Sequence, residues 1–428
     1  MTSRLARRGR SIAVGIVVAS ALALTACTGS GGISGGGNAD SLDKSVSGSI
    51  DGAIETAMQL SGSTEAIVGV WDGDENAYVR GYGNENLDGG SRIRAAQATR
   101  PVMCALLLDL VEQGKVKLDR EVSKDLTRQS GIEGVTYGQL CDMRSGIADF
   151  KGAYADIFAN NPTRYWPEQE LLAEGLAHSP LSWPGKDFHQ SDTNAVLLAR
   201  ALKVRTGQDI NNLLEDHVFS RAGMRSSEYN VDAKTLQGTT MTGLTYPSAG
   251  GAPVCDAEPV KVPEVSPSML AGAGATVTTV NDLKKFYDSY LGGEFGGSEN
   301  AKLSTEGQLT QNPKRDDQGE PTEELDPEGR QWAFGSEKVG PLYGNAGSMT
   351  GTLTAAYQDP KSGYTVIVSL NNSSAGAEFV KNVALQLAAI SAEGGVGPEL
   401  TWTAEQKAED VAKGAICQPA AEEPAPEE

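Results

Sequence analysis

Two serine motifs in the sequence have the spacing of nucleophilic catalysis. Ser41-Leu42-Asp43-Lys44 sets a hydroxyl and an amine one helical turn apart, so that the amine could take the proton of the serine. Gly32 to Gly36 reads Gly-x-Ser-x-Gly, a pattern that exposes a serine on a sharp turn between a strand and a helix. Both motifs lie in or beside a Gly/Ser-rich stretch where no strand–turn–helix unit is predicted. Such matches arise by chance in low-complexity sequence, and we assign neither a role.

The spacing of the other residues does not indicate a metal-binding or a phosphate-binding site. The three histidines, His178, His189 and His217, do not have metal-ligand spacing to one another or to the cysteines. No glycine-rich loop follows a predicted strand and opens a helix. Tyr165 and Trp166 are adjacent aromatics in a predicted loop, which either line a cleft mouth or pack the loop itself. The sequence predicts no metal and no cofactor.

A buried helix and a sheet are the elements that would have to position any catalytic groups. Residues 101–113 are apolar on nearly every face, with Pro101 suited to the first turn and Gly114 to the C-terminal stop. A helix that is apolar all round belongs in a core. Residues 66–70 and 77–82 predict two strands joined by a turn, preceded by a helix within residues 42–60.

The last third of the chain adds a second pair of strands. Residues 352–357 and 364–371 predict a hairpin, and residues 378–390 predict a helix after it. Strands at both ends with helices between them indicate one sheet closed by both termini. The predicted fold is α/β (α+β): an antiparallel sheet flanked by helices, with a mostly helical insertion, over residues 42–393.

Six segments of the chain follow one another in an order typical of one enzyme family. Leu110 to Asp119 looks like the segment after the family's nucleophile helix, and Thr136 to Gly146 like its next helix and Ser-Gly turn. Residues 183–207 resemble the approach to its second motif and the helix that follows. The match continues through residues 222–224, 271–286 and 343–371. Over residues 45–391 the chain thus resembles the serine β-lactamase and D-alanyl-D-alanine carboxypeptidase (penicillin-binding protein-like) family, nearest its class C and esterase-like branch.

The resemblance implies a β-lactamase/transpeptidase-like fold with three motifs around one cleft. A Ser-x-x-Lys turn at the start of the buried helix supplies the nucleophile and its base. A Tyr-x-Asn or Ser-x-Asn loop supplies a second proton-transfer group and an amide. A Lys-x-Gly or His-x-Gly strand supplies a polar group and backbone donors near the oxyanion.

This chain departs from the family at all three motifs. The Ser-x-x-Lys position holds Gln97-Ala98-Thr99-Arg100, in which the glutamine is no nucleophile and the arginine, with a pKa above about 12, is no base. The second motif reads Gln190-Ser191-Asp192, although a slip of one or two residues would bring Asn194 into play. The third reads Asn345-Ala346-Gly347, where only the glycine remains. We expect Asp192 and Arg100 to form a salt bridge across the former site.

The N-terminus carries the features of an exported lipoprotein. The chain starts with basic residues, and the apolar run 11–23 that follows is too short to span a bilayer comfortably. Together they predict a signal peptide over residues 1–26. An uncleaved membrane anchor is the alternative. Leu24-Thr25-Ala26-Cys27 resembles a bacterial lipobox, which implies lipidation of Cys27. Residues 27–41 predict a flexible Gly/Ser tether. We expect an outward-facing protein anchored to the cell membrane by lipid.

Charge and cysteines limit the partners and the compartment. Loss of residues 1–26, which hold four arginines and no acid, would leave 32 basic and 56 acidic residues, so no nucleic-acid partner is expected. Residues 394–428 predict a C-terminal extension with an acidic, disordered tail. The remaining cysteines, Cys104, Cys141, Cys255 and Cys417, allow three disulfide connectivities. We favour a bond between Cys104 and Cys141 and a bond between Cys255 and Cys417. Buried free thiols are the alternative for Cys104 and Cys141.

Three functions remain open from the sequence. The loss at all three motifs favours a non-catalytic protein of the envelope that binds a cell-wall peptide or another envelope protein. The family resemblance favours instead a hydrolase (peptidase, β-lactamase or esterase) with displaced groups, for which Thr99, Ser191 and Ser348 are candidates. A purely structural subunit is the third, and the sequence does not separate it from the first.

Overall fold

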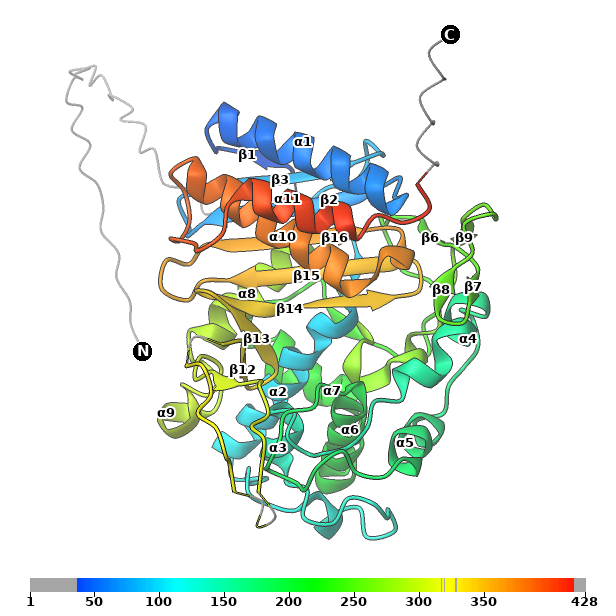
Figure 1. Ribbon diagram of the computed structural model, residues 1–428, viewed down its shortest axis with the longest axis vertical. Coiled ribbons are helices and arrows are strands. Elements are labelled where there is room, and N and C mark those ends of the chain that lie inside the picture. Colours follow the sequence, from blue (N-terminus) through cyan, green and yellow to red (C-terminus); the bar gives the residue numbers. More distant parts are fainter. Residues whose placement is uncertain (1–36, 317, 319, 328, 419–428) are drawn as a thin grey trace, which may run out of the picture. The chain divides into compact units, whose positions relative to one another are not determined.

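A nine-stranded antiparallel sheet is the frame of the molecule (Figure 1). The computed structural model describes residues 37–418 except 317, 319 and 328. The predicted signal peptide, Cys27, most of the predicted tether and the acidic end 419–428 lie outside the described residues. The strand order is β1-β3-β2-β16-β15-β14-β13-β12-β11, so strands from both ends of the described chain pair side by side. This arrangement confirms the predicted sheet closed by both termini and the predicted α/β class.

The strands of this sheet are β1 (Ala39–Asp40), β2 (Ala66–Asp72), β3 (Asn76–Tyr82), β11 (Gln308–Leu309), β12 (Gln331–Ala333), β13 (Ser336–Val339), β14 (Leu342–Met349), β15 (Thr352–Gln358) and β16 (Thr365–Leu370). Smaller sheets contain β4 (Ile93–Arg94), β5 (Glu228–Tyr229), β6 (Gly243–Thr245), β7 (Ser248–Ala249), β8 (Ala252–Pro253), β9 (Val260–Val262) and β10 (Thr276–Thr278). The α-helices are α1 (Lys44–Ser61), α2 (Thr99–Glu112), α3 (Tyr137–Cys141), α4 (Ala155–Asn160), α5 (Glu168–Ala177), α6 (Asp192–Thr206), α7 (Ile210–Leu214), α8 (Val280–Leu291), α9 (Gly297–Asn300), α10 (Gly376–Glu393) and α11 (Ala404–Lys413).

Helices cover both faces of the sheet (Figure 1). Alternate strand residues point to opposite faces, so Val68 and Val366 pack under α1 and α10, whereas Ile67 and Ile367 belong to the core that contains α2. Helix α2 is buried from Thr99 to Leu110, as its all-round apolar pattern predicts. The sheet and the helical insertion therefore meet along α2, and the Gln97 to Arg100 turn lies at its N-terminus.

The start of the folded part differs from that predicted. Strand β1 pairs Ala39 with Val79, so the folded part begins before residue 42 and the last residues of the predicted tether belong to it. At the other end, the predicted C-terminal extension packs on the domain up to residue 418, because α11 packs against α10 and the Ile416 N–H donates to the Leu60 carbonyl at 3.0 Å. Both contacts join residues far apart in sequence, which local patterns do not reveal.

Both favoured disulfides are present in the structure. Cys104 of α2 is bonded to Cys141 at the end of α3. Cys255, in the loop between β8 and β9, is bonded to Cys417 after α11. The favoured connectivity is therefore confirmed, and the second bond ties the C-terminal extension to the insertion.

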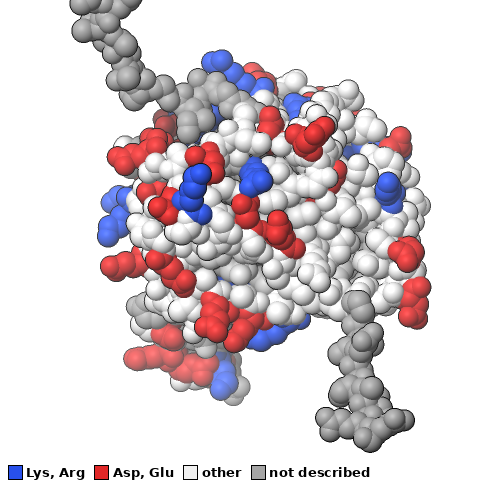
Figure 2. Space-filling view, turned by 90° about the horizontal axis from the view of Figure 1, so that it is seen from above, with Lys and Arg blue, Asp and Glu red and all other residues white. Residues whose placement is uncertain are grey.

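The surface charge is mixed on the face that α1 and α11 cover (Figure 2). On the face above α1 and α11, lysines and arginines lie scattered among acidic side chains (Figure 2). Within residues 37–418 no described helix combines the length and the hydropathy needed to cross a bilayer.

Candidate functional site

Gln97 and Arg100 occupy the turn that leads into the buried helix. Gln97 lies in the short 3-10 segment Ala96–Ala98, and Arg100 lies in the first turn of α2. Both side chains are almost fully enclosed, with 2% and 5% of their surfaces exposed. Ala96 has a φ of 46°, a left-handed conformation that is uncommon outside glycine and that turns the chain into the helix.

Asp192 binds both of these side chains. It is the first residue of α6, and it is fully buried. Its Oδ1 accepts hydrogen bonds from Arg100 Nε at 2.8 Å and Nη2 at 2.5 Å, and its Oδ2 accepts one from Gln97 Nε2 at 2.8 Å. The expected Arg100–Asp192 salt bridge is therefore present and desolvated.

The electrostatics of this cluster keep its charges in place. Burial alone would raise the pKa of Asp192, but the charges of Arg100 and Lys151 and the hydrogen bond from Gln97 outweigh it and lower that pKa. The Asp192 N–H also donates to Asp149 Oδ1 at 3.2 Å. Asp192 thus stays ionised and holds Arg100 as its counter-ion.

The amide oxygen of Gln97 binds the strand that carries the third motif. The Ser348 N–H, directly after Gly347 in β14, donates to Gln97 Oε1 at 2.8 Å. A Cβ added to Gly347 would lie 2.3 Å from the backbone nitrogen of Gln97, so only glycine allows this close approach. The backbone donor that the resemblance assigns to the oxyanion is thereby already bonded.

The other residues at motif positions are not brought into this cluster. Gln190 is exposed and forms no hydrogen bond with the described residues. Asn345 is buried, and its Nδ2 donates at 2.5 Å to the carbonyl of Gly335, which lies in the turn between β12 and β13. Asn194 is buried further along α6 and accepts from Ser145 Oγ at 2.5 Å. It is thus Asp192, not Asn194, that faces Gln97 and Arg100.

A model of the family described as Beta-lactamase matches residues 50–390. The chain belongs to the β-lactamase family. The match covers most of the sequence and contains every residue of the cluster, so the cluster lies in the domain that defines the family.

Individual relatives in the β-lactamase family are distant. The D-alanyl-D-alanine-carboxypeptidase/endopeptidase AmpH of Escherichia coli is 24% identical over 246 residues, 55% of this chain and 59% of the relative. A D-aminopeptidase of Cereibacter sphaeroides is 23% identical over 195 residues, 43% and 37% of the two chains. The chain therefore spans less than two thirds of the length of these curated relatives.

Solved structures show the same fold at low identity. A D-stereospecific amidohydrolase from Streptomyces has a TM-score of 0.63 at 21% identity, over 76% of this chain and 94% of that one. The octameric penicillin-binding protein homologue from Pyrococcus abyssi has a TM-score of 0.64 at 19% identity, over 82% and 78%. These likenesses concern the β-lactamase fold alone.

The three candidate nucleophiles of this β-lactamase family member have different surroundings. Thr99 is fully buried, and its hydroxyl accepts from the Thr276 N–H at 3.3 Å. Ser191 is fully buried and donates to the Ala148 carbonyl at 3.1 Å. Ser348 is half-buried and lines a cavity of about 270 Å³. Neither Thr99 nor Ser191 lines this cavity.

Lys151 is a site residue that sequence patterns did not single out. Its Nζ donates to the Ser348 carbonyl at 3.3 Å and lines the same cavity. Burial lowers the pKa of its amine. It begins the short 3-10 helix Lys151–Tyr154, where neither periodicity nor a motif marks it, and only the fold brings it to β14.

Proposed function

We propose that this member of the β-lactamase family is non-catalytic and serves as a binding or scaffolding protein of the cell envelope. The observation that carries the proposal is the network Ser348–Gln97–Asp192–Arg100, in which the Ser348 N–H, the Gln97 amide and the Asp192 carboxylate are bonded to one another or to Arg100. In this network only the buried Nη1 of Arg100 lacks a hydrogen-bond partner among the described residues. Reaction at this site would need a nucleophile, a base and a free backbone donor. Gln97 cannot attack, Arg100 stays protonated, and the Ser348 N–H is bonded to Gln97.

Opening this network for a substrate would be costly. Breaking a buried ion pair by removing one partner typically costs about 3–5 kcal/mol, because the other charge is left desolvated. The cavity that remains beside the network measures about 270 Å³, which is just below the range of about 300–1,000 Å³ that is usual for ligand pockets. The network therefore favours a structural use of the old site.

The location and partners belong to the same proposal. Cys27 would carry a lipid on the outer face of the cell membrane, and two disulfides suit an oxidising compartment. Relatives named as a D-alanyl-D-alanine carboxypeptidase and a D-aminopeptidase support a cell-wall peptide as the ligand. Another envelope protein is the second candidate partner.

The test is covalent labelling by a reporter penicillin and by an activated ester, read as intact mass. We expect the mass of the protein to remain unchanged. An adduct mapped to a single residue would contradict the non-catalytic reading. Binding of a peptide ending in D-Ala-D-Ala without turnover would support retained recognition.

The second candidate function is a hydrolase with a displaced nucleophile. Its position makes Ser348 a better candidate for that nucleophile than Thr99 or Ser191. Ser348 adjoins the cavity, and the Lys151 amine lies beside its carbonyl. The matched variant is Ser348→Ala. An adduct on the parent that disappears in this variant would establish the second candidate, whereas an unlabelled parent rejects it.

The lipid anchor has its own test. Cys27→Ser should release the protein from the membrane fraction of expressing cells. Retention of the variant in that fraction would contradict lipidation.

A further inference from the structure

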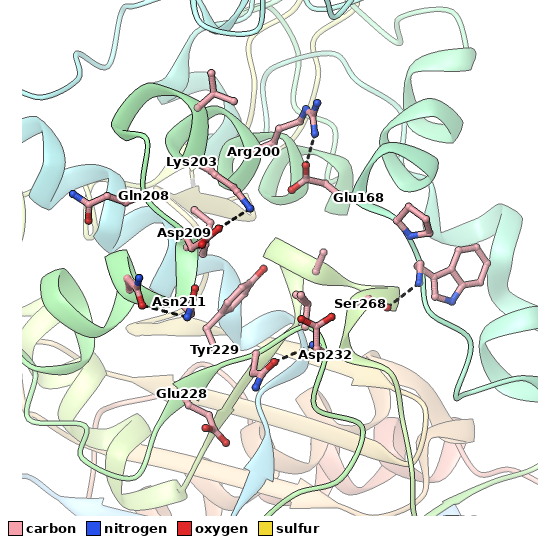
Figure 3. A pocket seen from close by; sticks show the side chains of 18 of the residues that line it. Glu168, Arg200, Lys203, Gln208, Asp209, Asn211, Glu228, Tyr229, Asp232 and Ser268 are labelled. Atoms are coloured by element: carbon pink, nitrogen blue, oxygen red, sulfur yellow. Dashed lines mark hydrogen bonds and ion pairs between the residues drawn. The ribbon is translucent and has the colours of Figure 1, made fainter.

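A second and larger pocket lies in the helical insertion, away from the Gln97–Asp192 network. It has a volume of about 1130 Å³ and is lined by the loop before α5, the later turns of α6, the start of α7 and the strand β5 (Figure 3). Helix α6 begins at Asp192 and reaches the pocket at Arg200, a rise of about 12 Å at 1.5 Å per residue. The pocket shares no lining residue with the former catalytic site.

The charged groups of this pocket are predominantly acidic. Its two cations are already paired, Arg200 with Glu168 at 2.6 Å and Lys203 with Asp209 at 2.7 Å. Three further carboxylates line it, those of Glu215, Glu228 and Asp232. The lining therefore keeps a surplus of negative charge after its internal ion pairs are counted.

The three additional carboxylates differ in how well they are satisfied. Glu228 is paired with Arg92 at 2.7 Å, and Glu215 accepts only a long hydrogen bond of 3.3 Å from Ser220. The carboxylate of Asp232 has no ion pair or hydrogen-bond donor among the described residues, and the residue is exposed. Asp232 is therefore the carboxylate most open to a cation.

Tyr229 is the independent observation that points to a ligand. It is 8% exposed, with its ring in the hydrophobic core, and its hydroxyl forms no hydrogen bond within the described chain. Figure 3 shows this hydroxyl in the open middle of the pocket, between the Lys203–Asp209 pair and Glu168. Burial and the charge of Glu168 raise the pKa of Tyr229, so the hydroxyl remains protonated and can donate.

These groups call for a ligand that offers both a cation and a carbonyl. The surplus carboxylates attract the cation, and Tyr229 donates to a neutral acceptor such as a peptide carbonyl. Tyr165, 53% exposed, adds an aromatic face among the lining residues. A metal ion fits poorly, since among the described residues no three His, Cys, Asp or Glu side chains converge to hold one. The acidic lining also repels phosphate groups.

We propose that this pocket binds a peptide with lysine- or arginine-type side chains, its cation at Asp232 and a carbonyl oxygen at the Tyr229 hydroxyl. The site is separate from the former catalytic turn, so the proposal does not depend on whether that turn reacts. A peptide with lysine or arginine side chains, free or part of a partner protein, would dock on the insertion. Helix α6 runs from this pocket to the buried Gln97–Asp192 network.

The experiment is calorimetric titration of the purified full chain with a blocked peptide, acetyl-Ala-Lys-Ala-Lys-Ala-amide. The control peptide carries glutamate in place of both lysines. We expect the lysine peptide alone to bind, and its affinity to fall as salt rises from low to physiological ionic strength. Absence of binding, or equal binding of both peptides, would overturn the proposal.

Two pocket variants and one matched control locate the site. Asp232→Asn should weaken the lysine peptide about tenfold, and Tyr229→Phe about threefold, since each removes one polar contact and little volume. Asp256→Asn makes the same chemical change on an exposed residue outside the pocket and should leave the affinity unchanged. Equal weakening by Asp232→Asn and Asp256→Asn would show general surface attraction and would overturn the assignment.

Discussion

Asp192 is the residue on which the former site depends. Its carboxylate bonds to Gln97 and Arg100 at once, and all three side chains are buried. A buried arginine without a counter-ion is far costlier than an exposed one, because little water reaches its charge. One carboxylate thus fixes the positions of the Gln97 and Arg100 side chains.

Replacing this carboxylate should therefore destabilise the fold. We expect Asp192→Asn to lower the free energy of unfolding by about 3 kcal/mol, since it leaves Arg100 charged and unpaired. Urea unfolding followed by circular dichroism measures this change. Glu121→Gln is the matched control, because Glu121 pairs with Lys124 on the surface at 3.7 Å and should matter by less than about 1 kcal/mol. Equal losses in the two variants would contradict the importance of burial.

Restoring the family motif tests whether the surrounding site is intact. Gln97→Ser with Arg100→Lys recreates Ser-x-x-Lys and frees the Ser348 N–H, but Asp192 would keep the new lysine protonated. We therefore expect slow acylation by a reporter penicillin in the double variant. Adding Asp192→Asn should raise the acylation rate at least about tenfold by releasing the amine. The rate is read by intact mass over time, and no acylation of either variant would show that the pocket itself has been rebuilt.

At the scale of elements, β14 and the turn before α2 are held in close contact by a glycine. Gly347 lies where any side chain would strike the backbone of Gln97, and backbone atoms cannot move aside cheaply. The contact sets the distance at which the Ser348 N–H meets the Gln97 amide. Gly347 is thus required for the packing of β14 against this turn.

Gly347→Ala should accordingly separate the two elements. We expect a loss of about 2–3 kcal/mol in the free energy of unfolding, measured by urea denaturation. Gly48→Ala in α1 is the control, because a Cβ there has open space and the change should stabilise the helix by up to about 1 kcal/mol. An unchanged stability of the Gly347 variant would mean that β14 is free to shift.

Local sequence patterns predict elements better than they predict the contacts between them. The apolar run 101–113 and the strands around residues 66–82 predict α2, β2 and β3 closely, because hydrophobic period and turn residues act locally. The Arg100–Asp192 pair was accessible only through the order of family motifs. The bond from Ser348 to Gln97 spans 251 residues, and the approach of Lys151 to β14 spans 197. No local pattern carries such distances.

At the scale of the whole molecule, the C-terminal extension acts as a clasp. It runs back along α10 and α1 and is bonded through Cys417 to Cys255 in the insertion. This disulfide spans 162 residues, whereas the Cys104–Cys141 bond spans 37. In the chain-entropy model the longer loop restricts the unfolded chain more, so the clasp is the more stabilising crosslink.

Removing the clasp should loosen the molecule without altering the former site. The double variant Cys255→Ser and Cys417→Ser should lose about 2–4 kcal/mol of unfolding free energy under oxidising conditions, because its unfolded chain gains freedom. Thermal unfolding with and without a reductant separates the two bonds: the reductant should lower the midpoint of the parent by more than that of the variant. The double variant should also leave the Gln97–Asp192 network unchanged, since the bond lies outside it. An equal effect of reductant on both proteins would show that Cys104–Cys141, and not the clasp, carries the stabilisation.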